Sequence, residues 1–286
     1  MFATLSKDFM ALEGKRIFVA GGAGSIGSEL VRQLVAGGNS VYVFDINETD
    51  MFDLVEILKL DGRNVAGRVG DVRNLDTVEE AFFEARPDLV FHCAALKHVA
   101  PNEGYPEEAV RTNVLGTINL VKVAKRHGVE RFVFISSDKA VSGASVMGAT
   151  KRLAELIVRN AGYTCVRFAN VLGSRGSIVP IWQRAIDTGR PVTVTDERML
   201  RFFMTIEEAC ALVLSAAEDG ESATYVLDMG EKVSVLDLAK RIIKESGRDI
   251  PIKMIGARAG ETFEERLMTP EEEGRAEKKN NFWIIK

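Results

Sequence analysis

Hydrophobic and polar positions follow two alternating rhythms over the first 170 residues. Short, uninterrupted apolar runs rich in β-branched and aromatic residues, such as RIFVA, VYVFD and RFVFI, alternate with longer stretches that have helical spacing. The pattern predicts strands at 16–20, 41–45, 64–70, 89–95, 131–137 and 164–168, and helices at 26–38, 51–60, 77–85 and 113–128. Because the strand runs are apolar throughout, we expect helices on both faces of the sheet. The sequence therefore predicts an α/β fold, a Rossmann-type doubly wound parallel sheet.

The rhythm breaks near residue 170, where Gly-rich and charged connections such as GSRGS, DTGRP and GARAGE become frequent. We expect residues 1–170 to form a dinucleotide-binding domain, with 1–14 as an N-terminal extension that is either a capping helix or mobile. Residues 171–286 are expected to form mainly a smaller α/β substrate lobe, with some segments returning to the first domain. The charged stretch 271–280, which lacks aromatic residues, predicts a solvated helix end or loop.

Composition narrows the classes of partner and compartment. The net charge of −4 gives no long-range attraction to nucleic acid, so anionic ligands need local sites. The cysteines lie inside apolar runs without metal-ligand spacing, which indicates buried thiols in a reducing compartment and no metal site. No apolar run reaches 18 residues and the N-terminus lacks the features of a signal peptide. We therefore expect a cytoplasmic protein with no membrane segment in this chain.

A cofactor site is indicated where the first strand runs into GGAGSIG and then a helix. Glycine permits a tight turn, and a helix N-terminus attracts a pyrophosphate, although glycines alone would also suit a purely structural turn. Asp45 ends the second strand, where a carboxylate binds ribose hydroxyls and repels a 2′-phosphate, which favours NAD over NADP. The candidate cofactor residues at the strand ends are Gly21, Gly24, Ser25, Ile26, Gly27, Asp45, Asp71, Val72, Ala94 and Ala95, with Lys97 after the fourth strand.

Candidate catalytic residues follow the fifth strand, which delivers Ser137, Asp138 and Lys139 to the same edge of the sheet. The next predicted helix carries Met147 and Lys151, four residues apart and so on one helical face, where both can point at a bound ring and ribose. A helix cap with a solvated lysine would be the structural alternative.

Several longer stretches together resemble one family: GGAGSIGSE, HCAALKHVAPNE, RTNVLGTINL, SSDKAV, MGATKRLAE, RFANVLGSRGSIVP and TDERMLRFFMT. From about Lys15 to Phe263 the chain resembles the extended short-chain dehydrogenases/reductases, and among them the UDP-N-acetylglucosamine 4,6-dehydratases of the CapD-like polysaccharide-biosynthesis branch. The resemblance places Ser137 and Lys151 in the Ser-Tyr-Lys set of the family. Met147 stands where most relatives have Tyr, and Met has no proton to exchange. Larger, membrane-bound members are similar in carrying Met, which points to that subgroup.

The resemblance implies a three-step reaction with internally recycled NAD. Hydride leaves C4 of the sugar for the nicotinamide, the C5 proton leaves with the C6 hydroxyl, and the hydride returns to C6. The resemblance makes Asp138 the candidate acid for the C6 hydroxyl and Lys139 the candidate C5 base. A lysine base must lose its own proton, and the neighbouring positive charges of nicotinamide and Lys151, together with burial, would help Lys139 to do so. The group that deprotonates the C4 hydroxyl stays open between Asp138 and a water relayed through Ser137.

The resemblance also implies a UDP-sugar site between the sheet edge and the second lobe. The corresponding substrate-binding positions are Lys97, Asn170, Arg175, Ser177, Arg201 and Arg258. Arginine suits a diphosphate because its planar fork makes paired, charge-assisted bonds. Asn113, counted among the cofactor-site residues with Lys151, is implied to stabilise the active-site backbone.

The expected product is a UDP-4-keto-6-deoxy-N-acetylhexosamine for surface polysaccharide or glycan synthesis. The Met at position 147 favours retention at C5, while inversion is the alternative found in Tyr-bearing relatives. A nucleotide-sugar 4-epimerase is the rival enzyme, and a non-catalytic NAD-binding protein is the rival from another class. Extended relatives pair through the helices that follow the fourth and fifth strands, which implies a homodimer or higher homo-oligomer.

Overall fold

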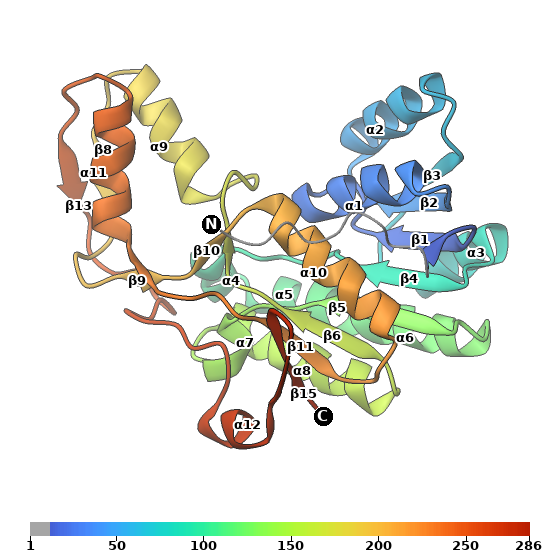
Figure 1. The fold of residues 1–286 in the computed structure, drawn as a ribbon. Coiled ribbons are helices and arrows are strands. Elements are labelled where there is room, and N and C mark those ends of the chain that lie inside the picture. The colour runs from blue at the N-terminus through green and yellow to red at the C-terminus, as the bar shows by residue number, and fades with distance from the viewer. Residues whose placement is uncertain (1–11) are drawn as a thin grey trace.

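The computed structural model describes residues 12–286, so most of the expected N-terminal extension lies outside the described residues. The centre of the molecule is a nine-stranded sheet (Figure 1). From one edge to the other its strands are β14 (Glu277–Lys279), β15 (Phe282–Ile285), β11 (Thr224–Leu227), β6 (Thr164–Arg167), β5 (Arg131–Ile135), β4 (Leu89–His92), β1 (Arg16–Ala20), β2 (Ser40–Asp45) and β3 (Val65–Val69). Neighbours from β3 to β11 are parallel, and β15 and β14 join in antiparallel pairing.

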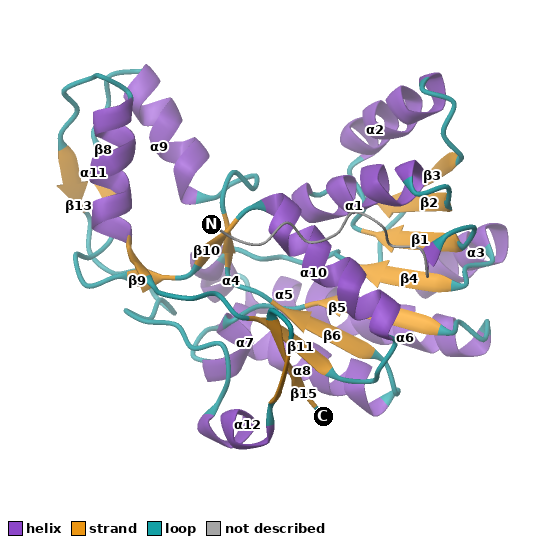
Figure 2. Cartoon of the chain, in the orientation of Figure 1, coloured by secondary structure: helices purple, strands orange, loops and turns teal. Residues whose placement is uncertain are grey.

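Helices cover both faces of this sheet (Figure 2). One face carries α1 (Ser25–Ala36), α2 (Glu48–Leu60) and α10 (Ile206–Asp219), and the other carries α3 (Leu75–Ala85), α6 (Gly116–Arg126) and α8 (Val146–Asn160). Leu30, Leu54 and Leu212 are buried in the core of the first layer, and Phe82 and Leu120 in that of the second. The expected doubly wound α/β fold is confirmed, because strands apolar on both faces need such cover.

The predicted strand and helix ends shift at two places that matter for the site. The fourth strand stops at His92 rather than at residue 95, so the residues that follow it are free to face a ligand. The long helix expected at 113–128 begins as a π-helix over Val110–Leu115 and continues as α6. π-Helical turns widen the backbone and often occur at functional sites. Short helices α4 (Val99–Gly104), α5 (Pro106–Ala109) and α7 (Lys139–Ser142) also lie in these connections.

Some segments after residue 170 form a small separate lobe, and others join the main sheet. A small lobe contains α9 (Ile178–Asp187), β8 (Val192–Val194), α11 (Val235–Glu245) and β13 (Ile252–Met254), packed around buried Trp182, Ile186 and Val192 (Figure 1). Strands β7 (Asn170–Val171) and β10 (Phe203–Met204) pair with each other, as do β9 (Leu200–Arg201) and β12 (Val233–Ser234). In contrast, α10, β11, β14 and β15 belong to the main sheet and its cover. Across residues 12–286, no helix combines the length and the apolar character needed to span a membrane.

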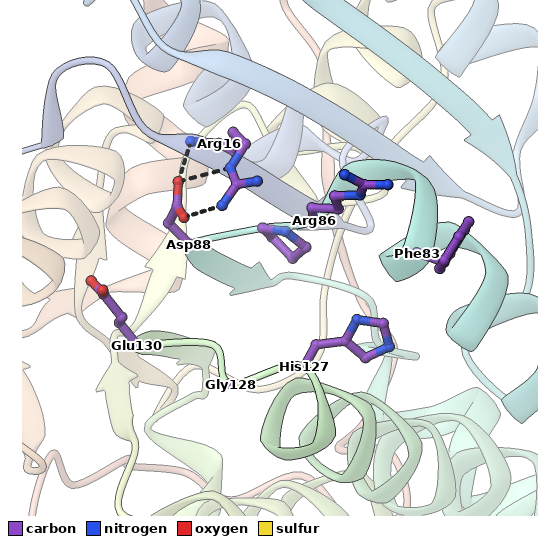
Figure 3. Close-up of a pocket in the computed structure, with 8 residues that line it drawn as sticks. Arg16, Phe83, Arg86, Asp88, His127, Gly128 and Glu130 are labelled. Carbon is purple, nitrogen blue, oxygen red and sulfur yellow. Dashed lines mark hydrogen bonds and ion pairs between the residues drawn. The ribbon is translucent and has the colours of Figure 1, made fainter.

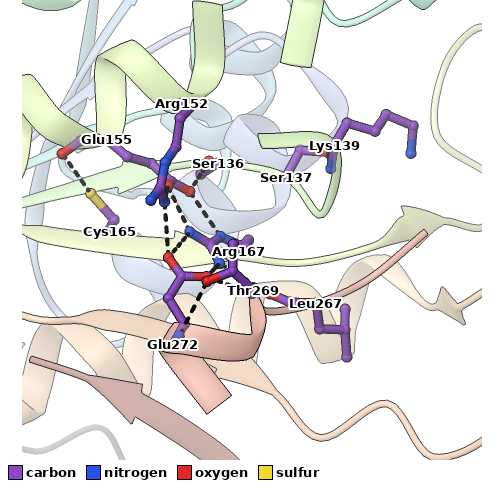
Figure 4. Close-up of polar contacts among 10 residues, drawn as sticks. All are labelled: Ser136, Ser137, Lys139, Arg152, Glu155, Cys165, Arg167, Leu267, Thr269 and Glu272. Carbon is purple, nitrogen blue, oxygen red and sulfur yellow. Dashed lines mark hydrogen bonds and ion pairs between the residues drawn. The ribbon is translucent and has the colours of Figure 1, made fainter. Parts of the chain in front are cut away.

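A buried ion cluster ties the C-terminal segment to the main domain (Figure 4). Arg167, at the end of β6, donates to Glu155 of α8 at 2.7 Å and to Glu272 of α12 (Pro270–Arg275) at 2.9 Å. It also donates to the Leu267 carbonyl at 3.0 Å, and Ser136 donates to Glu155 at 2.5 Å. The side chains of Arg167, Glu155, Glu272 and Ser136 are all buried.

The stretch 271–280, expected to be a solvated helix end or loop, is mostly exposed, and Glu272 is the exception. The stretch forms α12 and β14, and Glu272 is only 3% exposed. Charge alone predicts a solvated segment, but here one carboxylate has a buried guanidinium as partner, which the local sequence cannot reveal. Burial opposes ionisation of Glu272, yet hydrogen bonds from Arg167, its charge and the amide of Thr269 outweigh this and lower the pKa of Glu272 to about 2.

We predict that Glu272→Gln lowers the free energy of unfolding by about 3 kcal/mol, because Arg167 and Arg152 would then share Glu155 as their one carboxylate partner in the cluster. Urea denaturation at neutral pH measures this change. The lowered pKa means that the Glu272 contribution is present above about pH 4.5 and is lost as pH falls toward 2, and the variant should lack this part of the pH dependence. Glu273→Gln, on the exposed side of the same helix, is the matched control and should stay within about 0.5 kcal/mol of wild type. Equal stabilities of the two variants would contradict the role of the cluster.

Candidate active site

The glycine turn after β1 is packed too closely for side chains at two of its glycines. Gly21 has a φ of +74°, and a Cβ there would collide with the Ala94 backbone after β4. A Cβ on Gly27 would collide with the carbonyl oxygen of Gly21. Side chains of Asn47 and Asn74 cap α2 and α3, whereas α1 begins without a side-chain cap. The first amides of α1 are therefore available to an anionic ligand such as a pyrophosphate.

A cavity of about 380 Å³ opens beside this turn. Of the predicted cofactor residues, its lining includes Gly21, Gly24, Asp45, Asp71, Val72, Ala94 and Ala95. Asp45 accepts hydrogen bonds from the amides of Ala23 and Asn47, each at 2.9 Å, so its carboxylate braces the turn while it borders the cavity. Small side chains at the ends of the strands, an uncapped helix and a carboxylate after β2 together fit a dinucleotide.

Two predicted cofactor residues, Ser25 and Ile26, lie in the first turn of α1. The Ser25 hydroxyl accepts the backbone amide of Arg175 at 3.0 Å, which brings the segment after β7 against the glycine turn. The Arg175 guanidinium pairs with Asp50 of α2 and donates to the Ala23 carbonyl. Arg175 was expected beside the substrate diphosphate, but in this arrangement it lines the cofactor cavity instead.

The stretch after β5 forms a compact polar group. The Ser137 hydroxyl and the Lys139 ammonium both donate to one carboxylate oxygen of Asp138, at 2.9 and 3.0 Å. The side chain of Lys139 also donates to the Asn170 amide oxygen at 3.3 Å. Asp138 is fully buried, and its second oxygen, Oδ2, has no hydrogen-bond partner among the described residues. The structure thus brings Ser137, Asp138, Lys139 and Asn170 together. Oδ2 of Asp138 remains available to accept a hydrogen bond.

Met147 and Lys151 occupy the first turns of α8 and are both buried. The Lys151 ammonium donates to the Ile135 carbonyl at 2.7 Å and lies 4.6 Å from the centre of the Phe134 ring. Burial lowers the pKa of Lys151 to about 8. Neither residue lines the 380 Å³ cavity, and neither does the Ser137 to Lys139 group, so the polar group lies outside the cavity that fits the dinucleotide.

Asn113, in the π-helix, acts as a brace. Its side-chain oxygen accepts the Leu96 amide at 2.8 Å, and its nitrogen donates to the Leu96 carbonyl and to Thr150, each at 3.0 Å. Both polar atoms of the Asn113 side chain are therefore bonded within the protein. These bonds join the segment after β4 to helix α8. This arrangement accords with the expected backbone role and leaves Asn113 no polar atom unbonded for direct contact with a cofactor.

The remaining predicted substrate residues are scattered. Ser177 is the N-cap of α9, and its buried hydroxyl has no partner among the described residues, so it can donate to a ligand. Lys97 donates to Ser174 at 3.3 Å, and burial together with the charge of Arg175 lowers the pKa of Lys97. Arg258 is exposed in a loop of the small lobe. The role of these residues in binding a diphosphate stays a prediction.

Arg201, predicted to bind the substrate, contacts the C-terminal part of the chain in this structure. Its guanidinium donates to the carbonyls of Thr262 at 2.6 Å and Phe263 at 3.1 Å, so it holds the returning C-terminal segment. That segment carries Glu265, which the sequence analysis missed and which is only 4% exposed. Glu265 lies 3.9 Å from both the Lys139 ammonium and the Arg201 guanidinium. No pattern marks it, because it is one of several acids in a charged stretch.

A second cavity, of about 370 Å³, lies at the amino-terminal ends of the strands, away from the glycine turn (Figure 3). It is bordered by residues at the amino ends of the strands, including Asp88, which pairs with Arg16 at 2.6 Å, and by His127. In doubly wound folds ligands bind beyond the carboxyl ends of the strands. The cavity beside the glycine turn is therefore the candidate cofactor site.

Comparison with known proteins agrees with this geometry. The family model described as polysaccharide biosynthesis protein matches residues 17–286. The probable polysaccharide biosynthesis protein EpsC of Bacillus subtilis (strain 168) is 42% identical over 275 residues, which cover 91% of this chain and 46% of EpsC. The UDP-glucose 4-epimerase of Rickettsia canadensis (strain McKiel) is 34% identical over 286 residues, covering 95% of this chain and 82% of the epimerase.

The X-ray structure of Pen from Bacillus thuringiensis has a TM-score of 0.92 and 37% identity, covering 96% of this chain and 90% of Pen. The chain spans about half the length of EpsC. The family match extends from β1 to the C-terminus and so includes the glycine turn, the Ser137 to Lys139 group and the returning segment. The chain therefore belongs to the polysaccharide biosynthesis protein family, within the CapD-like branch of the extended short-chain dehydrogenases/reductases.

Proposed function

We propose that the chain catalyses NAD-dependent 4,6-dehydration of UDP-N-acetylglucosamine to a UDP-4-keto-6-deoxy-N-acetylhexosamine, with retention at C5. The observation that carries this proposal is the 3.0 Å contact between buried Asp138 and partly buried Lys139 at the carboxyl end of β5. Elimination of water needs a proton acceptor for C5 and a proton donor for the C6 hydroxyl, close together and shielded from solvent. A carboxylate and an amine in contact provide such a pair.

In this proposal the residues of the chain handle the protons of the reaction. When bound, NAD would supply the acceptor for the C4 hydride and the donor for C6. The Ser137 hydroxyl already donates to Asp138, so Asp138 can receive the C4 hydroxyl proton through Ser137. Asp138 then delivers that proton to the departing C6 hydroxyl. Lys139 takes the C5 proton, exchanges its ammonium protons with solvent, and later returns a proton to the same face of C5. Return by the same group explains retention.

The preference for NAD rests on Asp45. Its carboxylate lies at the end of β2 in the cavity, fixed by two backbone amides, and so is held where an adenosine ribose would bind. A carboxylate so placed accepts ribose hydroxyls and repels a 2′-phosphate. Met147, which has no proton to exchange, supports the Met-bearing subgroup and leaves the proton transfer to the residues after β5.

A 4-epimerase is the second candidate, favoured by the 34% identity to the Rickettsia canadensis UDP-glucose 4-epimerase. Epimerisation shares hydride removal from C4 but does not eject the C6 hydroxyl. The Asp138–Lys139 pair has no role in that reaction, which favours dehydration.

Pairing of two copies is also part of this proposal. Partly exposed apolar side chains lie on the π-helix, α6 and α8, where extended relatives are expected to pair: Leu115, Ile118, Leu153 and Leu156. Burial of these side chains against a second copy would remove apolar surface from water.

The first prediction of this proposal concerns the reaction itself. Incubation of the protein with UDP-N-acetylglucosamine in deuterated water should give a C6 methyl signal in the proton NMR spectrum, with deuterium at C5, because C5 loses and regains a proton. The C5 coupling constants report retention or inversion. Formation of UDP-N-acetylgalactosamine instead would support the epimerase, and absence of any change with added NAD would refute both.

The second prediction concerns Lys139. Lys139→Ala should reduce dehydration by at least about 100-fold, because the C5 base is lost, while NAD stays bound. Turnover is followed by the methyl signal, and cofactor content by absorbance after denaturation. Lys240→Ala, which removes an exposed lysine of α11, serves as control and should be as active as wild type. Full activity of Lys139→Ala would favour a non-catalytic NAD-binding role.

The third prediction concerns cofactor binding. Gly27→Ala should weaken NAD binding by more than about 10-fold, because a methyl group there collides with the Gly21 carbonyl and displaces the turn. Gly37→Ala, at the other end of α1, is the matched control, since its nearest neighbour would lie at an ordinary 3.5 Å. Calorimetric titration with NAD measures both. Similar affinities for the two variants would place the dinucleotide elsewhere.

A further inference from the structure

The segment that carries Glu265 is fixed on both sides of that residue. On one side Arg201 holds the carbonyls of Thr262 and Phe263, and Leu200 donates to Phe263 at 2.9 Å. On the other side Arg167 holds the Leu267 carbonyl at 3.0 Å. The chain between these two anchors therefore has little freedom, and the Glu265 side chain is held toward the group after β5.

The surroundings of Glu265 contain both signs of charge. Lys139 and Asp138 face it from the end of β5, and Arg201 faces it from β9. Lys139 thus lies between two carboxylates, with Asp138 at 3.0 Å and Glu265 at 3.9 Å. Burial raises the pKa of Glu265 above its ordinary value, the charges of Lys139 and Arg201 oppose the rise, and Asp138 adds to it. A carboxylate with a raised pKa takes up a proton more readily than an exposed one.

The proposed dehydration requires Lys139 to be uncharged when it acts, and Glu265 lies next to Lys139. The Lys139 ammonium donates to Asp138, and an ammonium cannot accept the C5 proton. Lys139 becomes a base only if its own proton goes to another group at the moment when Asp138 is already protonated. A second acceptor beside Lys139 is therefore required.

We propose that Glu265 is that acceptor, a positioning residue that exchanges a proton with Lys139 and thereby sets the state in which Lys139 acts; this inference rests on the proposed dehydration. Asp138 first receives the C4 hydroxyl proton, and Lys139 passes a proton to the Glu265 carboxylate. The neutral amine then takes the C5 proton, the C6–oxygen bond breaks as the C5–C6 double bond forms, and Asp138 protonates the leaving hydroxyl to give water.

The remaining protons return to their starting positions. After hydride is added at C6, Lys139 gives its proton back to C5, and Glu265 returns the stored proton to Lys139. Asp138 and Glu265 are again carboxylates, and Lys139 is again an ammonium. Apart from the water released, no proton is gained or lost in the cycle.

The test uses Glu265→Gln, which keeps the shape of the side chain but cannot store a proton. We expect kcat for dehydration to fall by at least about 100-fold with KM within about threefold, because binding is unaffected while Lys139 stays charged. Hydride removal from C4 should persist, so absorbance of the reduced nicotinamide should accumulate on mixing with UDP-N-acetylglucosamine. Glu264→Gln, the exposed neighbour that pairs with Lys232, is the matched control and should turn over as wild type does.

The pH profile separates this role from a merely structural one. In Glu265→Gln, solvent must remove the Lys139 proton, so dehydration should recover about tenfold per pH unit on raising pH, while wild type changes little over the same range. A low rate that does not depend on pH, or a rate equal to wild type, would overturn the inference.

Two further results keep the inference distinct from the proposed function. If wild type forms no C6 methyl product, the proposed function fails before Glu265 is tested. If Glu265→Gln does not fold, as judged by its thermal melt, Glu265→Asp replaces it: this variant should dehydrate at a reduced rate with a shifted pH profile, and a wild-type profile would overturn the inference.

Discussion

The contact between Arg167 and two buried carboxylates determines how the second half of the chain meets the first. Glu155 belongs to the main helical cover and Glu272 to the last forty residues, and the guanidinium joins them at 2.7 and 2.9 Å. Arg152 pairs with the same two carboxylates, so removal of either carboxylate would leave two guanidinium groups with one carboxylate between them. The cluster therefore specifies one position for the C-terminal segment, and through the Leu267 carbonyl it limits where Glu265 can lie.

Ser136 connects this cluster to the candidate catalytic group. Its hydroxyl donates to Glu155, and the next residue, Ser137, donates to Asp138. One network of polar contacts thus runs from the C-terminal helix to the end of β5 (Figure 4). Catalytic side chains need support from fixed neighbours, and here that support comes from charged residues as much as from the apolar core.

The two halves of the proposed site differ in how they are built. The cofactor half depends on backbone: glycines packed against Ala94, an uncapped helix and a carboxylate fixed by two amides. The elimination half depends on side chains brought from β5, β7 and the returning segment, namely Lys139, Asn170 and Glu265. The first half is built mainly where neighbouring parallel strands end, whereas the second depends on segments from both halves of the chain.

This difference explains what the sequence determined and what it did not. Strand periodicity, the glycine turn and Asp45 are local patterns, so the fold and part of the cavity lining could be predicted from sequence. The position of Ser137, Asp138 and Lys139 directly after β5 could be predicted for the same reason. The burial of Glu272 within the otherwise exposed stretch 271–280 was not predicted, and Glu265 was missed, because an acid in a charged stretch looks solvated until a distant cation is found beside it. Arg175 and Arg201 show the same limit: their residue type suits a diphosphate, but Asp50, Thr262 and Phe263 engage them in the folded chain. Local sequence determines periodicity and backbone conformation, whereas the partner of a charged side chain is decided by tertiary packing.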